Sequence, residues 1–100
     1  MIYCFDIDGT ICHTDGSDYE KSQPFDDVVE KIKSLYDEGH KIIMFTARGC
    51  TSGIDWSEFT EKQLKKWGVC YHELIMNKKP HYDILIDDKA ISAMAWRKLL

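Results

Sequence analysis

The sequence predicts an α/β fold, a parallel sheet with helices on both faces, in a single domain over residues 1–100. Short apolar runs rich in β-branched and aromatic residues are typical of buried strands. They alternate with segments whose apolar residues recur at helical spacing. Two of the apolar runs end in paired acids, and parallel sheets place ligands at the carboxyl ends of their strands. We therefore expect strands joined by right-handed crossovers, with polar chemistry at one edge.

The composition is that of a soluble globular domain. Hydrophobic residues make up 44% and charged residues 30% of the chain, which excludes a disordered protein. No apolar run approaches the roughly 18 to 20 residues that span a bilayer, and no secretory signal precedes the first run. The net charge of −4 argues against a nucleic-acid partner. The four irregularly spaced cysteines form no C-x-x-C pair, so we expect a reduced, cytoplasmic setting.

The first apolar run, residues 1–5, ends in two carboxylates. Side chains at alternate positions of a strand share a face, so Asp6 and Asp8 should point the same way where Gly9 lets the chain bend. Carboxylates that close together repel each other unless a cation lies between them, and a hard divalent cation, usually Mg2+, is the common solution. The alternative is an ordinary acidic turn after a strand.

A polar flap and an amphipathic helix follow. Residues 11–23 are too irregular for a confident helix, and we expect a flap or hairpin over the end of the first strand. Tyr19 in the flap could face a substrate or belong to a solvated loop. Pro24 fits the first turn of a helix, and Gly39 is its expected end.

The second strand, residues 41–45, leads into Thr46 and Arg48. A short hydroxyl at a strand tip can hydrogen-bond a transferring phosphoryl oxygen. The guanidinium of Arg48 could grip a phosphate or a carboxylate of the substrate, or it could be a surface arginine paired to an acid.

A loop over residues 50–56 precedes a second helix that runs to about Trp67, where Gly68 ends it. Trp56 and Trp67 are interpreted as core side chains of this helix, with a binding platform as the alternative. A third short strand is expected at residues 72–75. One loop, one helix and one strand leave no room for an inserted second domain.

The last strand, residues 83–86, runs into Asp87 and Asp88. Standing alone, this pair would be read equally well as a solvated acidic turn. Two apolar strands that each end in a pair of acids are improbable by chance in one small domain, and this coincidence favours a shared site. Residues 90–100 are predicted to form a last helix.

Four motifs in sequence order resemble those of the haloacid dehalogenase (HAD) superfamily of phosphotransferases. They are Asp6 and Asp8 in F-D-I-D-G-T, Thr46 after the second strand, Lys79 before Pro80 with Lys78 as its rival, and Asp87-Asp88 after the last strand. The resemblance implies a three-layer, Rossmann-like HAD core without a cap domain. The small size, F-T-A-R-G and D-D-K-A also look like short phosphatases associated with bacterial capsule polysaccharide biosynthesis.

The resemblance implies a role for each motif. Asp6 would be the nucleophile that forms an aspartyl-phosphate. Asp8 would be the general acid and then the base, and its pKa must be raised for that task. Thr46 and Lys79 would absorb charge on the phosphoryl oxygens.

The same resemblance implies a metal site and substrate contacts. Mg2+ would be held by Asp6, the backbone carbonyl of Asp8 and Asp87, while Asp88 would bind through water or hold Lys79. Gly9, Thr10 and Arg48 are the expected substrate-binding residues. Water exclusion would come from the flap, the loop at residues 50–56, the substrate or a neighbouring subunit of a homo-oligomer.

The expected function is therefore a Mg-dependent phosphomonoester hydrolase. The narrower resemblance implies a sugar phosphate of bacterial surface polysaccharide biosynthesis as substrate. One alternative is a phosphatase acting on a macromolecule or a nucleotide. Another is a non-catalytic binding module that kept the fold, although such a module has no need of an acid-base residue at Asp8.

Overall fold

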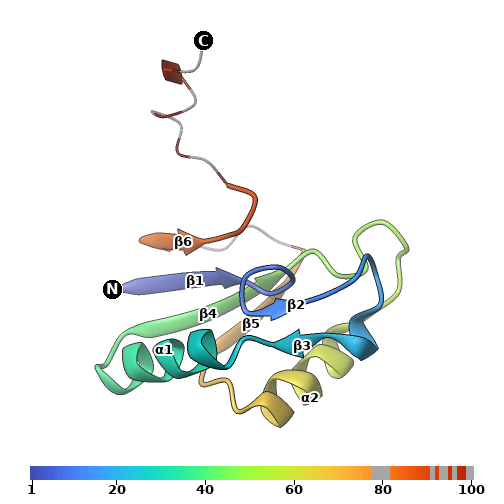
Figure 1. The fold of residues 1–100 in the computed structure, drawn as a ribbon, viewed down its shortest axis with the longest axis horizontal. Coiled ribbons are helices and arrows are strands. Elements are labelled where there is room, and N and C mark those ends of the chain that lie inside the picture. Colours follow the sequence, from blue (N-terminus) through green and yellow to red (C-terminus); the bar gives the residue numbers. More distant parts are fainter. Residues whose placement is uncertain (78–81, 91, 93–94, 96, 99–100) are drawn as a thin grey trace.

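A four-stranded parallel sheet forms the centre of the molecule (Figure 1). The computed structural model describes residues 1–77, 82–90, 92, 95 and 97–98. The strands are β1 (Ile2–Asp6), β4 (Lys41–Thr46), β5 (Glu73–Met76) and β6 (Ile84–Ile86), in the order β5-β4-β1-β6. The predicted α/β class and parallel sheet are confirmed. All four strands end at the same edge, where the predicted acids gather.

Both described helices, α1 (Asp26–Asp37) and α2 (Ser57–Trp67), pack against one face of the sheet (Figure 1). Their side chains share one core cluster with alternate residues of the strands. Its buried members include Phe5, Ile32, Ile42, Met44 and Leu64. The prediction placed helices on both faces, and its third helix, at residues 90–100, falls largely outside the described residues. No helix in the described ranges has the length and apolar character needed to cross a membrane.

The ends of the helices follow from local sequence. Asp26 and Asp27 lie in the first turn of α1, where they stabilise the helix dipole. Gly68 closes α2 in the left-handed conformation, with a φ of 74° that favours glycine. Pro24 was expected in the first turn of α1, and this is wrong: it pairs with Cys12 in a short strand. Proline lacks an N–H and is therefore suited to the edge of such a ladder.

The flap is a hairpin, as the sequence predicted. Strands β2 (Cys12–His13) and β3 (Gln23–Pro24) pair antiparallel, and a 3-10 turn, η1 (Tyr19–Lys21), lies between them. The side-chain amide of Gln63 donates a hydrogen bond of 2.7 Å to the carbonyl of Tyr19. This contact ties the flap to α2, so the hairpin has a fixed place above the carboxyl end of β1.

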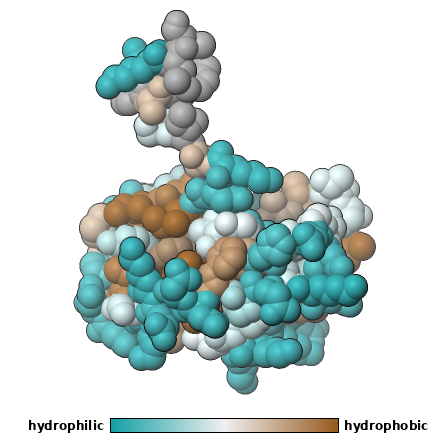
Figure 2. All heavy atoms as spheres, viewed as in Figure 1, coloured by the Kyte–Doolittle hydropathy of each residue, from teal (hydrophilic) through white to brown (hydrophobic). Residues whose placement is uncertain are grey.

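Hydrophobic side chains gather on the surface over β6 (Figure 2). They line a groove of about 480 Å³ between β6 and α1. The lining residues are Tyr3, Phe5, Thr10, Val28, Lys31, Ile32, Leu35, Ile84 and Ile86. The lining includes no carboxylate, so this apolar groove is distinct from the acidic edge of the sheet.

We predict that Leu64→Ala lowers the free energy of unfolding by about 2–5 kcal/mol, because it leaves a cavity where α2 meets the sheet. Leu64 is fully buried in the shared core. Urea denaturation measures the loss. Lys65→Ala is the matched control on the exposed side of the same helix, and it should change stability by less than about 0.5 kcal/mol. Equal losses in the two variants would contradict the placement of α2.

Candidate active site

Three carboxylates converge at the ends of two neighbouring strands. Asp6 ends β1, and Asp87 and Asp88 follow β6 directly. One oxygen from each carboxylate lies within 4.8 Å of the others. The pairing of Phe5 with Ile86 in the sheet sets this proximity, because it places the next residue of each strand side by side. The structure thus brings together three of the four acids that the sequence analysis placed at the metal site.

The three carboxylates carry like charges and repel one another. Burial, the charge of Asp87 and the charge of Asp88 raise the pKa of Asp6 to about 7. Ionisation of all three groups therefore requires a cation nearby. Carboxylate oxygens are the ligands that Mg2+ prefers. The chemistry of the donor set fits a magnesium site held by Asp6, Asp87 and Asp88.

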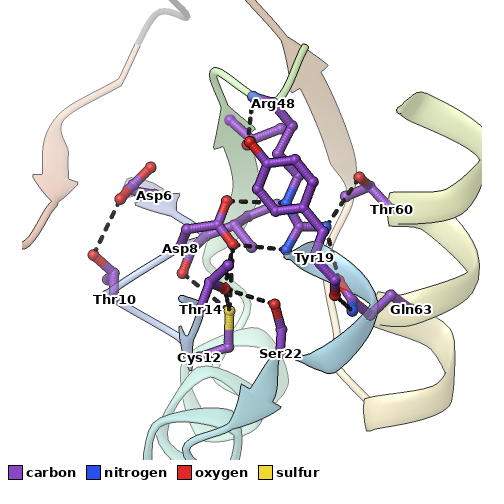
Figure 3. A network of polar contacts seen from close by, with 12 residues as sticks. Asp6, Asp8, Thr10, Cys12, Thr14, Tyr19, Ser22, Arg48, Thr60 and Gln63 are labelled. Carbon is purple, nitrogen blue, oxygen red and sulfur yellow. Dashed lines mark hydrogen bonds and ion pairs between the residues drawn. The ribbon is translucent and has the colours of Figure 1, made fainter. Parts of the chain in front are cut away.

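Asp8 has a different partner, Arg48 (Figure 3). The guanidinium donates two hydrogen bonds to the carboxylate, Nε to Oδ2 at 2.9 Å and Nη2 to Oδ1 at 2.7 Å. Arg48 is only 1% exposed. Of the two interpretations of Arg48, the structure shows pairing to an acid, although the pair is buried rather than on the surface.

The other donors of Arg48 are also engaged. Nη1 donates to Oγ1 of Thr60 at 3.3 Å and to Oε1 of Gln63 at 2.7 Å. The ring of Tyr19 covers the guanidinium, 4.5 Å from its central carbon to the ring centroid. These contacts fix the orientation of Arg48, and Arg48 in turn fixes Asp8.

The pKa of Asp8 is shifted in the direction opposite to the one that the sequence analysis required. Burial alone would raise it, but hydrogen bonds from Arg48 and Thr14, together with the charge of Arg48, hold it below its usual value. The sequence could not show that a bidentate arginine reaches Asp8 from β4. In this state Asp8 is an ionised carboxylate.

Gly9 and Thr10, expected to contact the substrate, position the acids instead. Gly9 has a φ of 87°, and a Cβ there would collide with the carboxylate of Asp88. The hydroxyl of Thr10 donates to Oδ2 of Asp6 at 3.5 Å and accepts the backbone N–H of Asp88 at 3.1 Å. The turn after β1 therefore brings Asp88 close to Asp6.

Thr46 lies at the tip of β4, beside the acids. Its side chain is buried, and its Oγ1 accepts the backbone N–H of Arg48 at 3.1 Å. Asn77, at a φ of 58°, donates its backbone N–H to the carbonyl of Thr46 at 2.9 Å. Its side-chain amide donates to the carbonyl of Arg48 at 3.4 Å. The turn after β5 thus supports the turn after β4.

The acids open onto a groove of about 320 Å³ between the flap and the strand tips, here named the acidic groove. Its lining residues are Asp6, Asp8, Gly16, Tyr19, Phe45, Thr46, Ala47, Arg48, Asp87, Asp88 and Lys89. Lys79 and its rival Lys78 fall outside the described residues. Lys89, which the sequence analysis did not consider, places a basic side chain in the lining.

Three polar residues of the site were missed in the sequence. Thr14 donates its hydroxyl to Oδ1 of Asp8 at 2.7 Å and lies 2.6 Å from the hydroxyl of Ser22 (Figure 3). Thr60 and Gln63 reach Arg48 from α2. Their spacing of three residues, on the same side of the helix as the buried Leu64, was a usable signal. A polar pair beside a helix's buried position indicates a buried polar partner.

Comparison with known proteins supports the fold. No protein-family model matches the chain, and no significant match is found among curated proteins. The crystal structure of an MCSG target from Vibrio cholerae is similar, with a TM-score of 0.71 and 27% identity over 96% of this chain and 87% of that one. The structure of a Pnkp1/Rnl/Hen1 complex matches with a TM-score of 0.61 and 21% identity, over 97% of this chain and 32% of that one. The four-stranded Rossmann-like α/β arrangement is therefore shared with solved proteins.

We predict strong coupling between Asp8 and Arg48. Arg48→Met should lower the free energy of unfolding by about 2–4 kcal/mol, because it leaves a partly buried carboxylate unpaired. Adding Asp8→Asn to that variant should recover part of the loss. A double-mutant cycle in urea isolates the coupling. The matched control is the exposed pair Lys33 and Asp37, 2.9 Å apart on α1, which should show weaker coupling. Equal coupling in both cycles would contradict a buried, oriented pair.

We also predict that Asp87→Asn stabilises the metal-free protein, because it removes one of three mutually repelling charges. The expected gain is about 1 kcal/mol after allowance for solvent screening, which raises Tm by about 4–8 °C in a domain of this size. Saturating Mg2+ should raise Tm in the natural protein and much less in the variant. Asp37→Asn, which removes the same charge from a lysine-paired acid, should give no gain. A lower Tm for Asp87→Asn without metal would refute the repulsive cluster.

Proposed function

We propose that this chain is a Mg-dependent phosphomonoester hydrolase of the HAD type that works through an aspartyl-phosphate on Asp6. The observation that carries the proposal is the convergence of Asp6, Asp87 and Asp88 within one groove at the carboxyl edge of the sheet. Repulsion within such a cluster destabilises a folded protein unless a bound cation offsets it, and that cation can in turn attract an anionic substrate. The motif resemblance in the sequence supports the same reaction.

In the proposed reaction, the carboxylate of Asp6 attacks phosphorus and forms a new P–O bond. The bond between phosphorus and the leaving-group oxygen breaks, and that oxygen must take up a proton. Water then hydrolyses the aspartyl-phosphate and restores Asp6. When bound by Asp6, Asp87 and Asp88, Mg2+ would supply positive charge against the phosphoryl oxygens. Thr10, which donates to Oδ2 of Asp6, helps to fix the nucleophile.

Asp8 is the proposed acid-base residue. Arg48 and Thr14 hold it in the ionised form that a base toward the attacking water requires. In the proposed first step Asp8 must first take up a proton from solvent, with loss of one of these hydrogen bonds. It then gives that proton to the leaving-group oxygen and regains one from the attacking water. Arg48 is therefore a positioning residue for Asp8, while Thr46 and Lys79 are the proposed partners of the phosphoryl oxygens.

The proposed substrate is a small phosphorylated metabolite, in the first place a sugar phosphate of bacterial surface polysaccharide biosynthesis. This choice rests on the narrower sequence resemblance. A phosphatase acting on a macromolecule or a nucleotide is the second candidate, favoured by the open border of the acidic groove. A binding module without catalysis would have no use for the network of side chains that orients Asp8, formed by Thr14, Tyr19, Arg48, Thr60 and Gln63.

The proposal predicts phosphate release from acetyl phosphate and from hexose phosphates with Mg2+, and none with EDTA. Asp6→Asn should lower turnover by about a thousandfold or more, because an amide cannot form the acyl phosphate. Its circular dichroism spectrum should be unchanged. Asp37→Asn, the same substitution on the far helix, is the control and should retain full activity. Turnover that persists in EDTA or in Asp6→Asn would refute the mechanism.

A further inference from the structure

We propose that a second groove, beside the acidic one, binds the leaving group of the substrate and selects an uncharged, hydroxyl-rich group about the size of one sugar ring. The inference rests on the proposed function, since it assigns the part of the substrate that departs from phosphorus. We name this second depression the neutral groove. It has a volume of about 290 Å³. Its lining residues are Ser17, Tyr19, Ala47, Gly49, Cys50, Thr51, Ser52, Ile54 and Trp56.

The neutral groove borders the acidic groove. Tyr19 and Ala47 line both. Tyr19 comes from the flap and Ala47 from the turn after β4, so the two depressions lie on either side of the same two residues. In the proposal, a phosphate at Asp6 has its ester group directed past Tyr19 toward the loop at residues 50–56.

The walls of the neutral groove suit a sugar. The rings of Tyr19 and Trp56 meet edge to face, with centroids 4.9 Å apart, and offer an apolar surface. Ser17, Thr51 and Ser52, which carry hydroxyls, also line the groove. An apolar surface bordered by a few polar groups is the usual composition of a site for a small polar molecule.

The lining also excludes a second charge on the leaving group. Its residues include no acid, lysine or arginine, whereas the acidic groove contains four carboxylates, Arg48 and Lys89. A carboxylate or second phosphate placed in the neutral groove would lose water without gaining a counter-charge, and this is costly. A neutral polyol loses little because its hydroxyls find partners.

The size of the groove is set by a folded loop. Gly49 has a φ of 84°, and a Cβ there would collide with the backbone carbonyl of Ile54. The N–H of Gly53 donates to the carbonyl of Gly49 at 2.9 Å, and the N–H of Ile54 to Oγ of Ser52 at 3.2 Å. The loop is thus held closed against itself. The volume of the neutral groove is at the lower end for small-molecule sites, which suits one sugar ring rather than a chain of sugars.

Charge variants at Thr51 test the inference, because this side chain is exposed at the groove and tolerates substitution. The measured quantity is the ratio of kcat/KM for glucose 1-phosphate or mannose 6-phosphate to that for acetyl phosphate. In the natural protein, kcat/KM for the hexose phosphates, whose leaving groups are uncharged, should exceed kcat/KM for 3-phosphoglycerate at least tenfold. Thr51→Lys should raise kcat/KM for 3-phosphoglycerate about tenfold relative to kcat/KM for the hexose phosphates. Thr51→Asp should lower the same ratio below its value in the natural protein.

The matched control is Ser34→Asp, which adds the same charge on the exposed side of α1 and should leave every ratio unchanged. If acetyl phosphate is hydrolysed but the ratios do not respond to Thr51 variants, or the natural protein prefers 3-phosphoglycerate, the neutral groove is refuted and the phosphatase stands. If natural protein with Mg2+ releases phosphate from no substrate, including acetyl phosphate, the proposed function fails and the groove assignment fails with it.

Discussion

Electrostatic repulsion among three carboxylates is the constraint on which the rest of the site depends. The parallel pairing of β1 with β6 places Asp6 beside Asp87, and the glycine turn after β1 lets Asp88 approach as well. The chain does not relieve the repulsion by moving these groups apart, since Asp6 lies in β1, Asp87 directly follows β6, and the N–H of Asp88 is bound by Thr10. The core between the sheet and the two helices must offset that cost. We expect such a cluster where a bound cation offsets the repulsion among the carboxylates.

The negative charge of the fourth acid of the site, in contrast, is balanced within the protein. Asp8 lies only two residues beyond Asp6, yet it receives its own positive partner, Arg48, inside the protein. Asp6 instead faces the acids that follow β6. As a result the pKa of Asp6 is raised and that of Asp8 is lowered. Carboxylates whose environments push their pKa values apart are suited to different roles in one reaction.

Local patterns in the sequence were sufficient to predict the strands of the parallel sheet and the edge of the sheet at which the acids meet. Each depends on alternation or helical spacing within a few residues. The partner of Asp8 could not be predicted, because Arg48 is 40 residues away and only the packing of α2 decides where its guanidinium points. Pro24 was misplaced because its φ suits both a first helical turn and an edge strand. The lysine assigned to the phosphoryl group stays a prediction.

The flap joins the two halves of the site. Thr14, directly after its first strand, donates a hydrogen bond to Asp8, while Tyr19 in its central turn covers Arg48 and lines both grooves. A leaving group that fills the neutral groove must touch the ring of Tyr19, and that ring lies against the residue that orients the acid-base carboxylate. In the proposed reaction, substrate selection and proton transfer would therefore depend on the same hairpin. In a single small domain, such a hairpin can do what an inserted second domain does elsewhere: it closes one side of the site and reads the part of the substrate that leaves.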